Sequence, residues 1–274
     1  MFRRTVFILF FLTNLLADEV NFVGEFKPGS LIFGKGDDVV QVMLNSRILD
    51  LDESGNFVFG FDRDEKGIQY LKVKFESGKS LIRRIVLPNR EYNIQRINNM
   101  KSKYVTAPNT EEERIKRERE IINIAKKKIG DEKKALYKDG FIRPVEGGVL
   151  TSVFGSQRIL NGVPRNAHNG LDIAAPTGTP VYAMADGIVR LAADNFYYSG
   201  NFIILDHGQG LNSSYLHLSN KDVKEGDFVK KGQKIGEIGT TGRSTGPHLH
   251  WSVQWFGKRT DPALLLKINS LEQQ

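Results

Sequence analysis

The sequence predicts a mainly β protein with an amino-terminal small β-sandwich, a charged linker helix and a carboxy-terminal antiparallel β-sheet domain. Three observations lead to this prediction. Short segments rich in Val, Ile, Leu and Phe alternate with turn-forming stretches through most of the chain. One central segment is densely charged and carries an isoleucine at every seventh position, which is a helical pattern. The last half is rich in glycine and shows little helical periodicity.

The composition narrows the classes of function. With 274 residues, 40% hydrophobic and 26% charged, the chain has room for one large or two ordinary globular domains. It contains no cysteine, so only His, Asp and Glu remain as metal ligands. The formal charge of +7 predicts attraction to anionic envelope polymers or to a membrane surface. The sequence has no helix-turn-helix, zinc-finger or RNP pattern, which argues against nucleic acid as a binding partner. The composition does not determine the oligomeric state.

Residues 1–17 have the layout of a secretory signal peptide. Arg3 and Arg4 precede an apolar run that ends at Ala17, and this run is short for a membrane span. The alternative is an uncleaved amino-terminal anchor, since Leu15 stands where a cleavage site carries a small residue. Both readings predict export to the periplasm or cell envelope.

Residues 18–92 are expected to form the β-sandwich. Segments 39–44, 57–61, 69–75 and 80–86 read as strands separated by turns. This region carries no pattern of reactive side chains, and we expect it to act as a spacer or docking domain.

Residues 93–140 are expected to be a linker that contains the charged helix. The polar stretch 93–109 reads as the linker itself, and Thr110 with Glu113 forms a capping-box pattern that predicts the start of the helix. The isoleucines at 115, 122 and 129 recur every seven residues, and Gly130 marks the expected end. The repeat is too short for a coiled coil, so we expect the helix to pack one narrow stripe on a neighbouring domain.

Residues 141–270 are expected to form the carboxy-terminal β domain, with strands at 187–193, 201–207, 211–218, 234–239 and 248–254. Four of the five histidines in the chain fall into three clusters in this region. His168 precedes Asp172 by four residues, His217 lies in a predicted strand, and His248 and His250 are two apart and so share one face of a strand.

This clustering reads as a metal site. A catalytic zinc ion takes three protein ligands and keeps one position for water, whose pKa it lowers to about 7. Additional histidines beside the metal can orient that water, move its proton or stabilise an oxyanion. The spacing alone does not tell which of His248 and His250 is a metal ligand and which is a catalytic residue.

Residues 141–262 resemble the lysostaphin/LytM-type zinc metalloendopeptidases in the segments HNGLD from residue 168, SYLHL around residue 217 and GPHLH ending at residue 250. The resemblance implies a duplicated hybrid motif fold and hydrolysis of peptide cross-links or stems in bacterial peptidoglycan. It also implies that His168, Asp172 and His250 hold Zn²⁺, and that His217 and His248 are the catalytic residues.

Three further sets of residues have alternative readings. His207 is expected to be a hydrogen-bonded structural residue, because the ligand set is already complete. Arg158 and Arg165 are candidates either for holding a substrate carboxylate or for plain surface salt bridges. The aromatic side chains of residues 197, 198, 251 and 255 either line a groove or are buried in the core, and we expect burial for each.

An alternative function is a catalytically silent peptidoglycan-binding module that activates another cell-wall hydrolase. Such a module would be expected to lack one or more of the site side chains. All five positions are filled here, which favours the enzyme.

Overall fold

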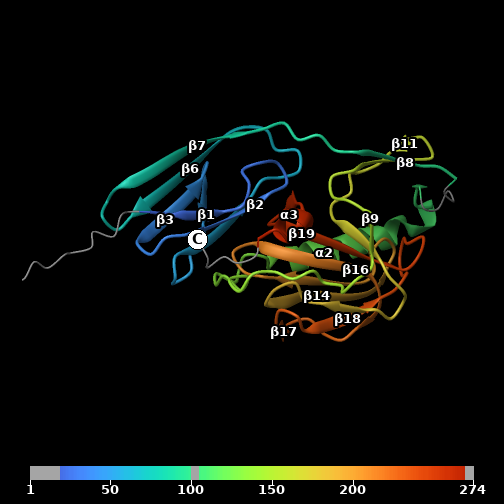
Figure 1. Ribbon diagram of the computed structural model, residues 1–274. Helices are drawn as coiled ribbons and strands as arrows, with labels where there is room; N and C mark the ends of the chain where they lie inside the picture. Colours follow the sequence, from blue (N-terminus) through green and yellow to red (C-terminus); the bar gives the residue numbers. More distant parts are fainter. Residues whose placement is uncertain (1–18, 100–104, 269–274) are drawn as a thin grey trace, which may run out of the picture.

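The structure, a computed structural model, describes residues 19–99 and 105–268 and is mainly β, as predicted (Figure 1). The predicted signal peptide, residues 1–17, lies outside the described residues. Within the described ranges, every helix is too short or too polar to cross a membrane.

The amino-terminal part consists of two antiparallel sheets. One has the strand order β1-β2-β5 and the other β4-β3-β6-β7. The strands are β1 (Asn21–Val23), β2 (Leu31–Lys35), β3 (Val39–Leu44), β4 (Arg47–Leu49), β5 (Asn56–Gly60), β6 (Gly67–Phe75) and β7 (Ser80–Leu87). The four strands predicted in this part are confirmed. Strands β1, β2 and β4 were not predicted, and β1 and β4, with three residues each, are too short to show a periodic pattern.

One buried apolar cluster runs through the amino-terminal sheets and the carboxy-terminal sheet. At their junction the ring of Phe33 lies 5.1 Å from that of Tyr137 and 5.4 Å from that of Phe141. Arg259 Nε donates to Asp62 Oδ2 at 3.0 Å across the same boundary. The two parts therefore share a core, and the division into domains at 18–92 and 141–270 stays a prediction.

The stretch expected to be a linker contributes a strand to the fold. β8 (Ile94–Ile97) pairs in parallel with β10 (Gln157–Leu160), which forms a hairpin with β11 (Val163–Pro164). Figure 1 shows β8 and β11 together above β9, away from the amino-terminal sheets. This pairing partner lies about sixty residues away in the sequence, so no local pattern announces it.

The charged helix begins later than the capping-box pattern predicts. The 3-10 turn η1 (Asn109–Glu111) precedes α2 (Glu112–Lys127), and no side chain caps the first turn of α2. The capping box at Thr110 is wrong, because η1 follows Pro108 directly and places Thr110 inside the turn. The packing stripe is confirmed: Ala125 and Ile129 are buried against strands β14 (Gly187–Phe196) and β15 (Gly200–Asp206).

A ten-stranded antiparallel sheet makes up the rest of the fold, with a main path β17-β14-β15-β16-β19-β12-β9. The strands of this sheet whose bounds are not yet given are β9 (Val149–Ser152), β12 (Leu171–Ala174), β13 (Pro180–Tyr182), β16 (Leu211–Lys221), β17 (Phe228–Val229), β18 (Lys234–Ile238), β19 (His248–Trp255) and β20 (Lys258–Thr260). The short helix α3 (Pro262–Leu265) follows β20. The five predicted strands are confirmed. Trp251 and Trp255 are buried as expected, whereas Tyr198 is 36% exposed because it lies in the turn between β14 and β15.

His207 is a buried structural residue, as predicted. Its side chain is inaccessible to solvent, its Nδ1 donates to the carbonyl of Asp186 at 2.7 Å, and its Nε2 lies 2.7 Å from Ser213 Oγ. Burial lowers the pKa of His207 to about 4, since a charged imidazole would lose its hydration there.

Acid should destabilise the fold through His207. The unfolded chain protonates this imidazole near pH 6.5, whereas the folded chain does so only near pH 4. Stability from this group is therefore present above pH 6.5 and is lost between pH 6.5 and pH 4, by roughly 3 kcal/mol. The variant His207→Asn keeps a hydrogen-bond donor but does not titrate. We expect it to be less stable than the wild type at pH 7 and to lose less free energy of unfolding when the pH is lowered. Urea unfolding of the wild type and of the variant at pH 7 and pH 5 measures the stability and its change with pH. An identical pH dependence of the two proteins would contradict the prediction.

Candidate metal centre

The pairing of β12 with β19 creates the first half of the site. In this antiparallel register Asp172 stands directly opposite His250, so both side chains project from one face of the sheet. His250 Nδ1 lies 2.7 Å from Asp172 Oδ1. His248 precedes His250 by two residues on β19 and emerges from the same face.

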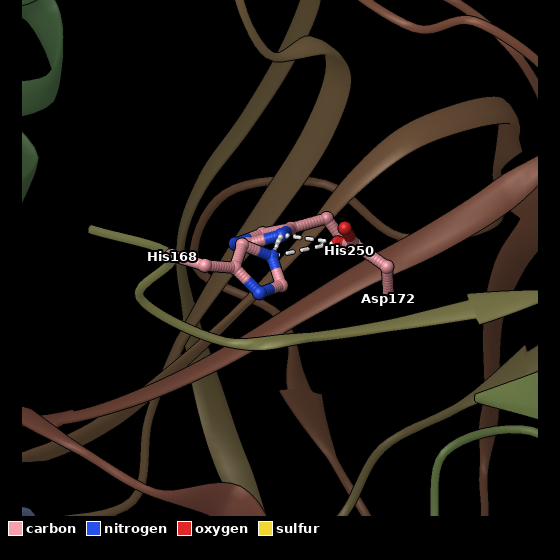
Figure 2. A group of neighbouring side chains, drawn as sticks. All are labelled: His168, Asp172 and His250. Atoms are coloured by element: carbon pink, nitrogen blue, oxygen red, sulfur yellow. Dashed lines mark hydrogen bonds and ion pairs between the residues drawn. The ribbon is translucent and has the colours of Figure 1, made fainter. Parts of the chain in front are cut away.

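His168 completes a compact group from the loop before β12. Its backbone N–H donates to the carbonyl of Ser156 at 2.9 Å, which anchors the loop. Its Nε2 lies 2.9 Å from Asp172 Oδ1 and 3.0 Å from His250 Nδ1 (Figure 2). The ligand atoms of His168, Asp172 and His250 all lie within 4.8 Å of one another. The structure thus brings together the three residues predicted as metal ligands.

The hydrogen bonding of this group fits a metal ion. His168 Nδ1 lies 3.0 Å from the carbonyl of Val153, which can only accept, so Nδ1 carries the proton. Nε2 of the neutral ring then directs a lone pair at the carboxylate of Asp172. A cation between these atoms would relieve the repulsion of the converging electron pairs. Tetrahedral zinc would hold its ligand atoms about 3.3 Å apart, so displacements of a few tenths of an ångström would admit it.

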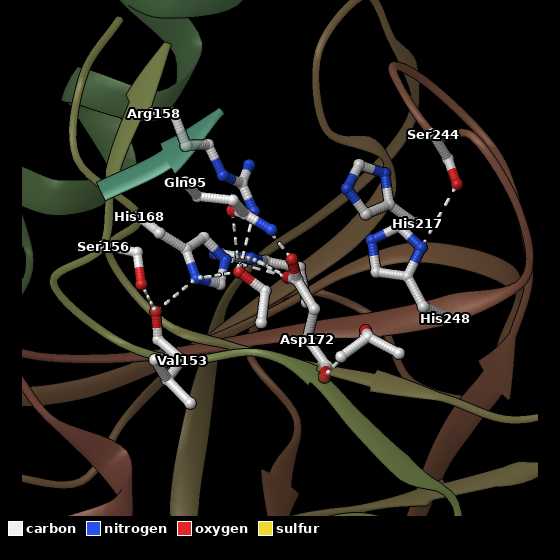
Figure 3. A network of polar contacts seen from close by, with 12 residues as sticks. Gln95, Val153, Ser156, Arg158, His168, Asp172, His217, Ser244 and His248 are labelled. Atoms are coloured by element: carbon white, nitrogen blue, oxygen red, sulfur yellow. Dashed lines mark hydrogen bonds and ion pairs between the residues drawn. The ribbon is translucent and has the colours of Figure 1, made fainter. Parts of the chain in front are cut away.

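The electrostatics favour the protonation states that a ligand set needs. Burial opposes ionisation of Asp172, but the neighbouring side chains of His168 and His250 outweigh this effect, so the pKa of Asp172 lies well below its ordinary value. Burial lowers the pKa of His250, which favours the neutral imidazole. Arg158 Nη2 donates to Asp172 Oδ2 at 2.8 Å, leaving Oδ1 for the group (Figure 3). Ionised carboxylate and neutral imidazole are the forms that bind metal.

His217 reaches the site through a distortion of β16. Between its pairings with β15, β16 contains one extra residue, which forms a β-bulge around residues 216–217. His217 itself has φ +67°, a left-handed conformation that costs energy for a residue with a side chain. Its ring centroid lies 4.8 Å from that of His248 and 6.4 Å from that of His250. The bulge therefore directs the imidazole of His217 toward the group formed by His168, Asp172 and His250.

Backbone carbonyls fix the orientation of both remaining histidines. His217 Nδ1 donates to Thr241 O and His248 Nδ1 donates to Gly246 O, each at 2.8 Å. Ser244 Oγ lies 3.3 Å from His248 Nδ1 (Figure 3). Burial, followed by the proximity of His248, lowers the pKa of His217 to about 3. In its uncharged form, each ring held in this way presents an Nε2 lone pair that can accept a proton.

Sequence reasoning missed these supporting groups. The carbonyls of residues 153, 241 and 246 orient three imidazoles, but a carbonyl is common to every residue and gives no signal in the sequence. For Arg158 the structure shows an ion pair with Asp172, and Arg165 Nη2 donates to Thr106 Oγ1 at 2.7 Å.

Residues 166–262 match the profile described as Peptidase family M23. The chain contains a peptidase family M23 domain. It is 46% identical over 121 residues to peptidoglycan DD-endopeptidase ShyA of Vibrio cholerae, covering 44% of this chain and 27% of that protein. It is 40% identical over 126 residues to the DD-carboxypeptidase/endopeptidase Mpg of Neisseria meningitidis, covering 46% of this chain and 29% of that protein. The matches thus span less than a third of these relatives.

A solved structure resembles most of the chain. A crystal structure from Pseudomonas aeruginosa, described as a candidate peptidase M23, is similar with a TM-score of 0.63 and 28% sequence identity. The similarity covers 88% of this chain and 95% of that one, so it extends beyond the M23 domain into the amino-terminal part.

Gly170 should be indispensable to the geometry of this site. A Cβ at this position would lie 2.3 Å from Trp251 O and 3.0 Å from His250 Cε1, so Gly170→Ala must displace β19 or the ring. We expect a loss of about 1–3 kcal/mol in the free energy of unfolding, together with weaker metal retention. Gly246→Ala is the matched control, because its Cβ would enter open space in the same region. Urea unfolding and bound-metal content are measured for both variants. Equal stability and equal metal content of the two variants would contradict the prediction.

Proposed function

We propose that the M23 domain binds Zn²⁺ through His168, Asp172 and His250 and hydrolyses peptide bonds in the cross-links or stems of bacterial peptidoglycan. The observation that carries the proposal is the approach of the three ligand atoms to 2.7–3.0 Å of one another in a buried group. The M23 relatives named as peptidoglycan endopeptidases support the choice of substrate.

Neighbouring groups hold the proposed ligand residues in position. When bound, zinc would polarise the scissile carbonyl and lower the pKa of a water molecule, which supplies the nucleophile. Arg158 keeps Asp172 in place through Oδ2. The carbonyl of Val153 holds His168 in the tautomer whose Nε2 faces the site. These contacts hold the ligand set in position and exclude alternative rotamers.

His217 and His248 are proposed as the catalytic residues. Their Nδ1 atoms are occupied by the carbonyls of Thr241 and Gly246, so their Nε2 atoms are the available proton acceptors. One can take the proton of the attacking water and deliver it to the leaving amine, while the other, once protonated, stabilises charge on the substrate oxygen. The rings lie side by side, so they are positioned to act on the same substrate.

The location of the protein follows from its proposed substrate and its first residues. Peptidoglycan lies outside the cytoplasmic membrane, and residues 1–17 have the pattern of an export signal. We therefore propose that the protein acts in the periplasm or cell envelope. The catalytically silent alternative is disfavoured by the complete set of site side chains.

Removal of one ligand should abolish metal binding and hydrolysis together. We expect the wild-type chain to hold about one zinc ion and His250→Ala to hold almost none, because two ligands do not retain the ion. Gln254→Ala, four residues further along β19, is the control and should keep both metal and activity. Zinc measured by atomic spectroscopy after gel filtration decides this, and full zinc content in His250→Ala would argue against the ligand assignment.

Removal of a proposed catalytic histidine should greatly slow hydrolysis while leaving metal binding intact. We expect His217→Ala and His248→Ala to retain zinc while losing about 100- to 10,000-fold in rate, the range for a lost general acid–base group. Digestion of purified peptidoglycan, with the released fragments identified by mass, measures the rate and the bond cleaved. Undiminished release of the same fragments by either variant would show that its histidine is misassigned.

A further inference from the structure

The connection between β14 and β15 is part of the backbone framework around His217. In this connection, the carbonyl of Ser199 accepts the N–H of His217 at 3.0 Å. At the start of β15, the N–H of Asn201 donates to Thr241 Oγ1 at 2.9 Å. The carbonyl of Thr241 in turn accepts from His217 Nδ1 at 2.8 Å. The backbone and the ring of His217 are therefore both held by groups that depend on the path of this connection.

His217 depends on such support because its backbone is strained. Its φ of +67° is a left-handed conformation, and a residue with a side chain keeps such a conformation only where the surrounding contacts hold it. The hydrogen bond from His217 to Ser199 acts directly at the strained residue. If the connection shifted, the bulge could relax toward a regular strand, and the imidazole would turn away from the metal centre.

Helix α2 holds the same connection from outside the sheet. Glu118 Oε2 accepts the N–H of Tyr197 at 2.8 Å, and Glu118 Oε1 accepts from Arg114 Nε at 2.8 Å. Arg114 Nη2 donates to the carbonyl of Asn195. The Glu118 side chain is 13% exposed, so its charge-assisted hydrogen bonds are partly shielded from water. One carboxylate and one guanidinium thus fix two backbone groups of the connection, two residues apart in the chain.

Apolar packing places α2 on the same face of the sheet as the candidate metal centre. Leu216 stands opposite His250 in the pairing of β16 with β19, so the two side chains project to one face. Leu216, which directly precedes His217, packs against the buried cluster that contains Ala125 of α2 and Phe202 of β15. The helix therefore lies on the sheet face from which the metal ligands project, beside the bulge that carries His217.

We propose that Glu118 and Arg114 are positioning residues for the reaction. Through the segment 195–199 they hold His217 in the orientation in which its Nε2 acts on the substrate. The inference rests on the proposed function. Both residues lie outside residues 166–262, the part of the chain that matches the M23 profile. The helix that the sequence predicts as part of a linker is thus a component of the site.

The test compares Glu118→Ala, Glu118→Gln and Arg114→Ala with Glu120→Ala, each in the zinc-loaded full-length chain with a soluble cross-linked peptidoglycan peptide. Glu120 is exposed on the same helix and is the matched control, because its removal changes the charge of α2 equally. We expect Glu118→Ala to lower kcat by about ten-fold or more and to leave KM and zinc content near the wild-type values. The reason is that a displaced catalytic group slows the reaction without weakening the binding of substrate or metal.

The other variants grade this effect. Glu118→Gln keeps an oxygen that can accept the N–H of Tyr197 and should recover most of the rate. Arg114→Ala removes the contact with Asn195 and should lower kcat to an intermediate value, whereas Glu120→Ala should leave kcat unchanged. An unchanged kcat in Glu118→Ala, or a loss of rate that only follows a loss of zinc, overturns the positioning role.

Amide hydrogen exchange of the zinc-loaded chain supplies a readout that needs no catalysis. We expect the N–H of His217 to exchange about ten-fold faster in Glu118→Ala than in the wild type and in Glu120→Ala, because its hydrogen bond to Ser199 opens more often. The amides of β19 should exchange as in the wild type. If Glu118→Ala does not fold, the same comparison with Arg114→Ala decides.

The exchange result separates this inference from the proposed function. Equal exchange of the His217 N–H in variant and wild type, or an equal acceleration throughout the sheet, overturns the positioning role. Faster exchange confined to the surroundings of His217, in a chain that hydrolyses no peptidoglycan peptide, counts against the proposed function and leaves the positioning role supported.

Discussion

The register between β12 and β19 is the constraint on which the site depends. It places Asp172 opposite His250, and a slip of one residue would send one of the two side chains to the other face of the sheet. The register is held by the core: Trp251 pairs with Leu171 on one side and with Tyr215 on the other, and all three are almost completely buried. The apolar face of the sheet thus determines the geometry of its polar face.

Irregular backbone supplies what the regular sheet cannot. His168 lies in a loop and His217 on a bulge with a left-handed φ, so neither position belongs to an undistorted strand. Carbonyl groups of Val153 and Thr241 then fix which nitrogen of each ring carries the proton. Strain of this kind persists because the neighbouring strands hold the chain on both sides. The regular pairing places Asp172 and His250, and the irregular segments direct the imidazoles of His168 and His217 toward them.

The amino-terminal part contributes to the surroundings of the site. β8 pairs with β10, which brings Gln95 Oε1 within 3.4 Å of Ser152 Oγ. Ser152 Oγ in turn lies 3.1 Å from His168 Nδ1 and 3.2 Å from Arg158 Nη2. Together with the shared aromatic core around Phe33, these contacts link the front of the chain to the candidate metal centre.

The sequence by itself determined the long strands, the packing stripe of the helix and which residues form the candidate site, because side-chain type and the alternation of apolar residues are local properties. It also indicated that His207 is structural. Only the tertiary structure decided the strand at 94–97, the later start of the helix and the exposure of Tyr198. Each of these depends on a partner or turn geometry that no local pattern encodes. The same holds for the orientation of the imidazoles, since the carbonyls that fix them belong to loops whose paths are set by distant strands.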